Sequence, residues 1–360
     1  MKKKGLVLLF LFLTFFCNFL NAQQIDRYSS VKIYLDNRSL ADLQALCRDL
    51  DHGEFLPDEN AFLTSLRKNA IRDLRRHNVR IAIVVEDEAQ DFMNRNDLAD
   101  FNRYRETGSG DQFKLNFEAT CGPISSSIST PAAFTPGSMG GYYTYSEMIT
   151  KINEMKSSYP SLVDTFTIGF SWEGRRLIGV KISDNADIDE PESEVLFLGL
   201  QHAREAITMT SLIFTMQYLL QNYNLDSRIK DLVDNREQFF IPCMNPDGYV
   251  YNQTTNPGGG GTWRKNRRNN GNGTYGVDLN RNYGVDWGCC GGGSSTTSSD
   301  TYWGPFPFSE PETQALRNFV SGRNFTTGLD QHSYGGYYSL PYGINGAHTY
   351  SAVDSQYYAY

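Results

Sequence analysis

Two histidines of this chain follow directly after predicted strands, and one of them has a glutamate three residues further on. His202 and Glu205 come after the apolar stretch 194–200, and His332 follows the predicted strand 325–331. In open α/β sheets, ligand sites form just beyond the carboxyl ends of strands. Two imidazoles and a carboxylate leave a fourth zinc position open for water, as in catalytic zinc sites. The three residues are therefore candidate ligands of one Zn²⁺ per chain.

Each part of this pattern also has an ordinary structural explanation. A His-x-x-Glu pair can arise by accident on a helix surface, and a lone histidine such as His332 is more often a hydrogen-bonding residue than a ligand. The chain has only five histidines. That two of them directly follow predicted strands favours the metal site without establishing it.

Alternating strands and helices are expected to position these residues. The patterns predict helices over 145–158 and 206–222 and strands over 162–170, 176–182, 194–200, 238–241 and 325–331. Ser309 and Glu312 have the spacing of a capping box at the start of a helix that reaches Val320. The order predicts an α/β fold with a mixed sheet and helices on both faces.

Three further segments precede this domain. Residues 1–22 have the pattern of a secretory signal peptide, with Lys2, Lys3 and Lys4 before an apolar run over 5–16. This predicts export, to the periplasm or the exterior. A retained membrane anchor is the alternative, although the run is short for a span, and no later segment has the length and apolar character for one.

A small α+β domain is predicted over residues 23–102, with strands at 31–35 and 79–85 and helices at 39–50 and 59–76. Ser39 is the expected N-cap of the first helix. Residues 103–137 are rich in Gly, Ser and Pro and predict a linker. The larger domain then covers 138–360.

Composition excludes some functions. A formal charge of −8 argues against a nucleic-acid binder, although Arg264, Lys265, Arg267 and Arg268 form a local basic run. Five cysteines remain after the signal, too few for a disulfide framework in a chain of this length. We expect one or two optional bridges.

The motifs around the candidate ligands resemble the zinc metallocarboxypeptidase family of the carboxypeptidase A, B and T type. His202-x-x-Glu205 is followed, 127 residues after the glutamate, by His332-Ser333-Tyr334. Further similar motifs lie between them in the same order: Asn245-Pro-Asp-Gly248, Trp263-Arg264-Lys265, Asp278-Leu-Asn280-Arg281-Asn282 and Ser309-Glu-Pro-Glu312. The resemblance covers about residues 138–360.

This resemblance implies a role for each matching residue. His202, Glu205 and His332 would bind zinc, and Asn280 and Arg281 would hold the C-terminal carboxylate of a peptide or protein substrate. Arg264 would stabilise the oxyanion of the tetrahedral intermediate. Arg204, Ser333 and Tyr334 would contact the substrate. The domain at 23–102 resembles a propeptide, either inhibitory or an accessory to folding.

The resemblance also implies a general base that the sequence does not contain. The family places this glutamate on a strand well after the third ligand, but Asp354 is the only acidic residue after His332. We therefore expect a C-terminally truncated zinc carboxypeptidase. Two alternatives stay open: a peptidoglycan-peptide hydrolase of the same family, and a non-catalytic zinc- or peptide-binding module.

Overall fold

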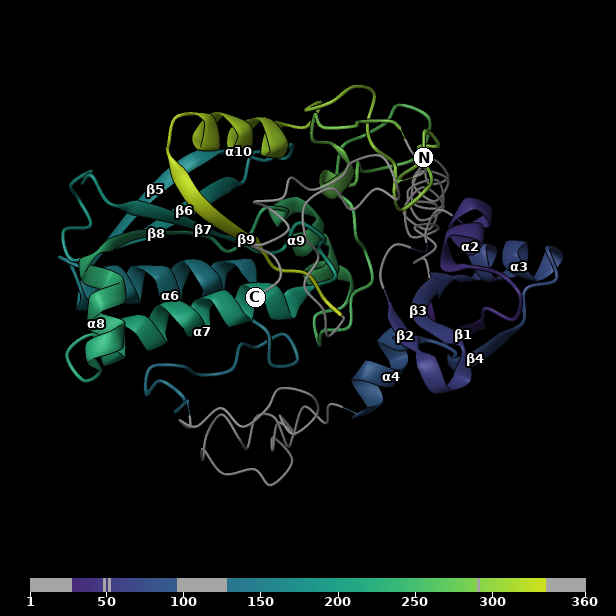
Figure 1. The fold of residues 1–360 in the computed structure, drawn as a ribbon, viewed down its shortest axis with the longest axis horizontal. Coiled ribbons are helices and arrows are strands. Elements are labelled where there is room, and N and C mark those ends of the chain that lie inside the picture. The colour runs from purple at the N-terminus through teal and green to yellow at the C-terminus, as the bar shows by residue number, and fades with distance from the viewer. Residues whose placement is uncertain (1–27, 48–49, 51–52, 96–127, 290–291, 335–360) are drawn as a thin grey trace, which may run out of the picture.

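The structure is a computed structural model, and it describes residues 28–47, 50, 53–95, 128–289 and 292–334. Two β-sheets organise these residues, one in an N-terminal unit and one in a larger unit (Figure 1). The predicted signal peptide and most of the predicted linker fall outside the described residues. Among the described residues, no helix is both long and apolar enough to cross a bilayer.

The N-terminal unit is a four-stranded antiparallel sheet in the order β2-β3-β1-β4. Its elements are β1 (Tyr28–Tyr34), α2 (Leu40–Leu46), β2 (Glu54–Leu56), η1 (Pro57–Glu59), β3 (Ala61–Arg67), α3 (Lys68–Arg76), β4 (Ile81–Val85) and α4 (Glu88–Arg95). Apolar residues of the strands, such as Val31 and Ile33, pack with Leu43 of α2 and Leu74 of α3 in one core. Ser39 caps α2 through a capping box with Asp42, as predicted.

The helix predicted over 59–76 is wrong in its first half, because Ala61–Arg67 forms β3. This segment pairs with β1 over its whole length, from Tyr28↔Arg67 to Tyr34↔Ala61. Its buried residues alternate in part with half-buried ones, which is the period of a strand. Only α3 has the helical period. The apolar residues of this short segment fit either a helix or a strand, and its pairing with the distant strand β1 decides in favour of a strand.

The larger unit contains a five-stranded mixed sheet in the order β5-β6-β8-β7-β9. Its elements are α6 (Tyr145–Ser158), β5 (Val163–Phe170), β6 (Arg176–Ile182), β7 (Ser193–Leu198), α7 (Ala206–Asn222), α8 (Ser227–Asp234), β8 (Arg236–Ile241), α9 (Pro246–Thr255), η2 (Leu279–Arg281), α10 (Pro311–Ser321) and β9 (Phe325–Asp330). Strands β5, β6 and β8 are antiparallel neighbours, whereas β8, β7 and β9 run parallel.

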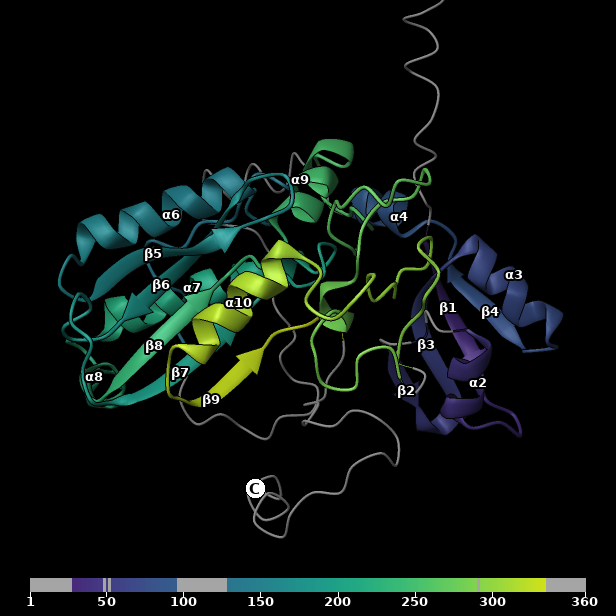
Figure 2. The ribbon, with the colours of Figure 1, turned by 90° about the horizontal axis from the view of Figure 1, so that it is seen from above.

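Helices cover both faces of this sheet, which confirms the predicted fold class (Figures 1 and 2). Alternate residues of β8 face opposite layers, because Phe240 packs with α6 and α7 whereas Phe239 packs with α10. Figure 1 shows α6 and α7 on one side of the strands and α10 on the other. The core is thus two apolar layers separated by the sheet.

The predicted capping box at Ser309 is wrong. Helix α10 begins at Pro311, and Glu310 is its N-cap without a side-chain capping bond. Proline is favoured at the first helical position, which places the cap one residue later than Ser309. The Ser309 hydroxyl instead donates to Glu310 Oε1 at 2.7 Å.

Two parallel strands bring the candidate ligands together. Strands β7 and β9 are neighbours, and Leu198 at the end of β7 pairs with Asp330 at the end of β9. The last ladder bond runs from the Gln331 amide to the Leu198 carbonyl at 2.9 Å. The segments with His202 and His332 therefore leave the same edge of the sheet.

Candidate metal and substrate site

The turn from β7 to α7 holds His202 and Glu205. Leu200 is buried with a φ of 53°, a left-handed conformation that is uncommon for a residue with a side chain. The Thr208 hydroxyl holds this turn, because it accepts from the Leu200 amide and donates to the Glu205 carbonyl. Glu205 is the N-cap residue of α7 but makes no side-chain capping bond. Its carboxylate is therefore directed at the two histidines instead.

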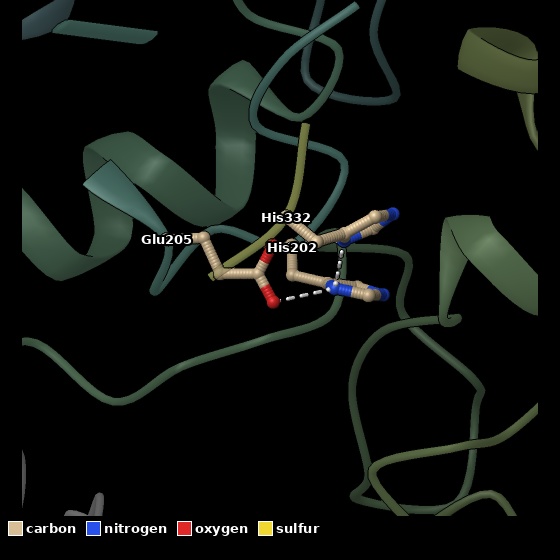
Figure 3. A group of neighbouring side chains, drawn as sticks. All are labelled: His202, Glu205 and His332. Atoms are coloured by element: carbon tan, nitrogen blue, oxygen red, sulfur yellow. Dashed lines mark hydrogen bonds and ion pairs between the residues drawn. The ribbon is translucent and has the colours of Figure 1, made fainter. Parts of the chain in front are cut away.

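The three candidate ligands converge on one point (Figure 3). His202 Nδ1 lies 2.8 Å from Glu205 Oε1, His332 Nδ1 lies 2.9 Å from Glu205 Oε2, and the two Nδ1 atoms are 3.1 Å apart. His202 and Glu205 are buried, whereas the His332 side chain is 25% exposed. The cluster is therefore closed on the His202 side and open beside His332.

This donor set fits a zinc ion. Ligands about 2.0–2.1 Å from a tetrahedral zinc are about 3.3 Å from one another, close to the observed separations. Two imidazole nitrogens and a carboxylate are also ligand types that zinc prefers. Burial alone would raise the pKa of Glu205, but His202 and His332 outweigh it and hold that pKa well below its ordinary value. The carboxylate is therefore ionised, as a metal ligand requires.

Asp278 and Arg264 lie behind His202. Asp278 Oδ1 is 3.2 Å from His202 Nε2, the ring nitrogen that faces away from the cluster. Arg264 donates to Asp278 Oδ2 from Nη2 at 2.8 Å and from Nε at 3.1 Å, and both side chains are fully buried. Burial opposes ionisation of Asp278, but Arg264 and His202 hold its pKa well below the ordinary value. Arg264 thus contacts Asp278, which in turn contacts the candidate ligand His202.

Asn280 and Arg281 lie on η2, next to the cluster. Asn280 Nδ2 is 3.2 Å from His332 Nε2, and Arg281 donates from Nη1 to the Asn280 carbonyl at 2.9 Å. Both residues line a cavity of about 320 Å³ together with Tyr283, Trp287 and Trp303. The structure therefore brings an amide and a guanidinium to a cavity beside the candidate ligands.

Arg204, Ser333 and Tyr334 belong to a different cavity from that of Asn280 and Arg281. They line a second cavity of about 500 Å³ together with Glu205. Residues of the N-terminal sheet complete its wall, among them Ser30, Thr64 and Ser65. All nine predicted site residues thus lie within or next to the cluster, although Arg264 reaches it through Asp278.

Sequence reasoning assigned no role to three residues that hold the site. Asp278 belongs to the motif Asp278-Leu-Asn280-Arg281-Asn282, yet only the fold shows that it contacts His202. Asn245 donates from Nδ2 to the carbonyls of Gln201 at 3.1 Å and Arg264 at 3.2 Å, which joins two segments of the site. Asp330 contacts His332 from the end of β9. No spacing in the sequence signals these contacts.

The chain belongs to the zinc carboxypeptidase family, whose sequence profile matches residues 148–359. It is 41% identical over 156 residues to a zinc carboxypeptidase of Saccharothrix mutabilis subsp. capreolus, covering 43% of this chain and 35% of that protein. It is 35% identical over 205 residues to carboxypeptidase O of Bos taurus, covering 56% and 53%. The chain thus spans about a third to a half of these curated relatives.

A solved carboxypeptidase A from Helicoverpa armigera has a similar fold, with a TM-score of 0.63 and 25% sequence identity. The match covers 87% of this chain and 71% of that one. This share is larger than residues 138–360, so the match also includes some of the preceding residues. The resemblance to metallocarboxypeptidases inferred from the motifs is confirmed.

Proposed function

We propose that the protein is a zinc-dependent exopeptidase that hydrolyses the C-terminal peptide bond of peptides and proteins. The main support for this proposal is that His202, Glu205 and His332 converge beside Asn280 and Arg281. A metal site next to a guanidinium fits a substrate whose reacting bond lies one residue from a free carboxylate. Bound zinc would supply a Lewis acid and lower the pKa of a coordinated water.

The chain's own residues would orient the substrate around that centre. A guanidinium can hold a carboxylate through two parallel hydrogen bonds, which suits Arg281 to the C-terminal anchor. Asn280 would add an amide donor or acceptor. Arg204 and the Ser333–Tyr334 segment line the second cavity and would contact residues before the scissile bond. Arg264 is proposed to stabilise the oxyanion, and its ion pair with Asp278 also orients His202.

The ligand assignment is tested by zinc analysis of the full-length protein and of His202→Ala. We expect about one zinc per wild-type chain and a large loss in the variant. His77→Ala is the matched control, because His77 is an exposed residue at the end of α3 in the N-terminal unit. Equal zinc in wild type and His202→Ala would overturn the assignment.

The substrate class is tested with a blocked dipeptide and with its C-terminal amide. A charge-assisted hydrogen bond contributes about 1.5–3 kcal/mol, so removing the carboxylate should lower kcat/KM by about 10- to 100-fold. A peptidoglycan-type peptide as a third substrate separates the alternative within the family. Equal rates on acid and amide would contradict a carboxypeptidase.

We also propose that residues 23–102 form a propeptide-like domain that covers the site, with 103–137 as its linker. Tyr28 donates to Asp300, a residue of the larger unit, and Arg67 Nη2 lies 3.4 Å from the same carboxylate. Arg204 Nη1 lies 3.7 Å from Asp300 as well. The carboxylate of Asp300 therefore links the N-terminal unit to Arg204, a proposed substrate-binding residue. Export from the cell belongs to the same proposal, since such domains suit a secreted enzyme.

A further inference from the structure

A chain of side-chain contacts leads from His332 to two other segments of the site. His332 Nε2 lies 3.1 Å from Asp330 Oδ2, and the same oxygen accepts from Gln201 Nε2. Gln201 Oε1 in turn accepts from the Tyr283 hydroxyl at 2.9 Å. These residues come from the end of β9, the end of β7 and the segment after η2. The contacts therefore link the two histidine-bearing segments to the Asn280–Arg281 loop.

His332 depends on such contacts more than His202 does. Among the described strands, β9 pairs with β7 alone, and its residues are mostly exposed. His332 lies beyond the last ladder bond, which ends at Gln331. His202, by contrast, is fully buried inside a turn whose backbone is held by Thr208 and Asn245. The orientation of the His332 ring must therefore come mainly from side chains.

Each histidine has a carboxylate beside its Nε2 atom, and Nε2 of His332 additionally lies 3.2 Å from Asn280 Nδ2. Asp278 contacts Nε2 of His202, and Asp330 contacts Nε2 of His332, so each Nδ1 faces Glu205. A hydrogen on Nε2 that is donated to a carboxylate leaves Nδ1 with its lone pair directed at the cluster. Outer hydrogen-bond partners of this kind orient metal-binding histidines and increase their basicity.

We propose that Asp330, held in place by Gln201 and Tyr283, is the positioning residue for His332 in the metal site. Its carboxylate holds the ring in the tautomer and orientation that present Nδ1 to the metal. Gln201 is 3% exposed and bridges the ends of β7 and β9. It thereby sets the spacing of the two histidines. This inference rests on the proposed zinc site.

The test is the zinc affinity of the full-length protein, measured by competition with a chromophoric chelator at constant pH. Loss of an outer partner typically lowers metal affinity by about 10- to 100-fold, which is the expected effect of Asp330→Ala. Asp330→Asn retains an oxygen that can accept from Nε2 and should recover much of the affinity. Tyr283→Phe removes only the far end of the contact chain, so its effect should be smaller than that of Asp330→Ala.

The matched control is Asp164→Ala on β5, at the opposite edge of the same sheet. It should bind zinc like the wild type. The absorption spectrum of the Co²⁺-loaded protein gives a second readout, since a displaced His332 changes the ligand field whereas a general loss of stability does not. If Asp330→Ala does not fold, Asp330→Ser, which also removes the carboxylate but keeps a polar side chain, takes its place in both readouts with the same expected and overturning results.

The outcomes separate the two proposals. Wild-type zinc affinity and an unchanged Co²⁺ spectrum in Asp330→Ala would overturn the positioning role and leave the zinc site intact. Failure of the wild type itself to bind zinc would instead overturn the proposed function. The inference is supported if zinc affinity falls in Asp330→Ala, recovers in Asp330→Asn and stays at the wild-type value in the control Asp164→Ala.

Discussion

Besides its proposed contact with substrate, Arg264 is expected to stabilise the fold, because it forms a fully buried ion pair with Asp278. Removal of one partner from a buried pair leaves an uncompensated charge and costs about 3–5 kcal/mol. We expect Arg264→Ala to lower the free energy of unfolding by this amount and to lower kcat as well. Urea unfolding together with steady-state kinetics would measure both.

Arg264→Lys separates the two contributions. A lysine keeps the charge near Asp278 but loses the two-pronged contact from Nε and Nη2. We expect it to recover part of the stability. If Arg264→Ala unfolds like the wild type, the ion pair does not stabilise the fold, and the role of Arg264 lies with the substrate alone.

Arg281 is expected to act on binding rather than on the chemical step. Its proposed contact with the substrate carboxylate exists both before and during the reaction, so its loss should raise KM and leave kcat largely unchanged. We predict an increase in KM of roughly tenfold or more for Arg281→Lys, since lysine cannot hold a carboxylate through two parallel bonds. Steady-state kinetics on a blocked dipeptide would decide this. A fall in kcat at constant KM would assign Arg281 to the transition state instead.

At the scale of elements, Glu312 joins α10 to two loops of the larger unit. It is fully buried, and its carboxyl group accepts from the Trp172 amide at 3.1 Å and from Asn266 Nδ2 at 3.3 Å. Burial raises its pKa from the ordinary value of 4.5 to about 8. The folded protein therefore keeps a proton on Glu312 at neutral pH that the unfolded chain has already released.

This difference predicts a pH dependence of stability. Between pH 4.5 and pH 8 the folded state binds more protons than the unfolded state, so the free energy of unfolding falls as the pH rises. Glu312→Gln stays neutral and should escape this loss. We expect the variant to gain on the wild type from pH 5 to pH 8, by at most about 1.4 kcal/mol per pH unit. Urea unfolding at several pH values tests this against Glu154→Gln, an exposed control on α6. Parallel pH curves for Glu312→Gln and wild type would show that Glu312 is ionised throughout.

At the scale of the whole molecule, the N-terminal sheet lies beside the loops of the larger unit (Figures 1 and 2). Asp300 is the shared contact, since Tyr28, Arg67 and Arg204 all reach its carboxylate. Arg67 additionally donates from Nη1 to the Ser298 carbonyl at 3.2 Å. These buried polar contacts would have to break before the second cavity opens to a large substrate.

Cleavage within the proposed linker, residues 103–137, should therefore raise activity only once the two units separate. We predict that Asp300→Ala speeds this separation, because Arg67 and Arg204 then lose their common partner. Limited proteolysis, followed by size-exclusion chromatography and a peptidase assay, would measure separation and activity together. Asp226→Ala is a suitable control, since Asp226 caps α8 at a distance from these contacts. Unchanged activity after complete separation would favour a folding role for the N-terminal unit.

Local patterns in the sequence were sufficient to identify His202 and Glu205 as candidate metal ligands. His202 and Glu205 are three residues apart at a strand-to-helix turn, so their meeting depends on a few backbone angles. The alternation of strands and helices predicted the mixed sheet for a similar reason, because each period of hydrophobicity reports one buried face. The short segment 61–67 was misassigned, since its apolar residues fit either period and only its pairing with β1 decides between them.

The tertiary structure decided which distant residues meet. His332 joins Glu205 across 127 residues only because β9 pairs in parallel with β7 and sets Leu198 opposite Asp330. The outer partners Asp278 and Asp330 depend on the same arrangement, as does the position of Arg264 behind His202. A carboxylate in a sequence carries no sign of the imidazole it will contact. That partner is fixed by strand register and loop packing, which arise from the whole chain.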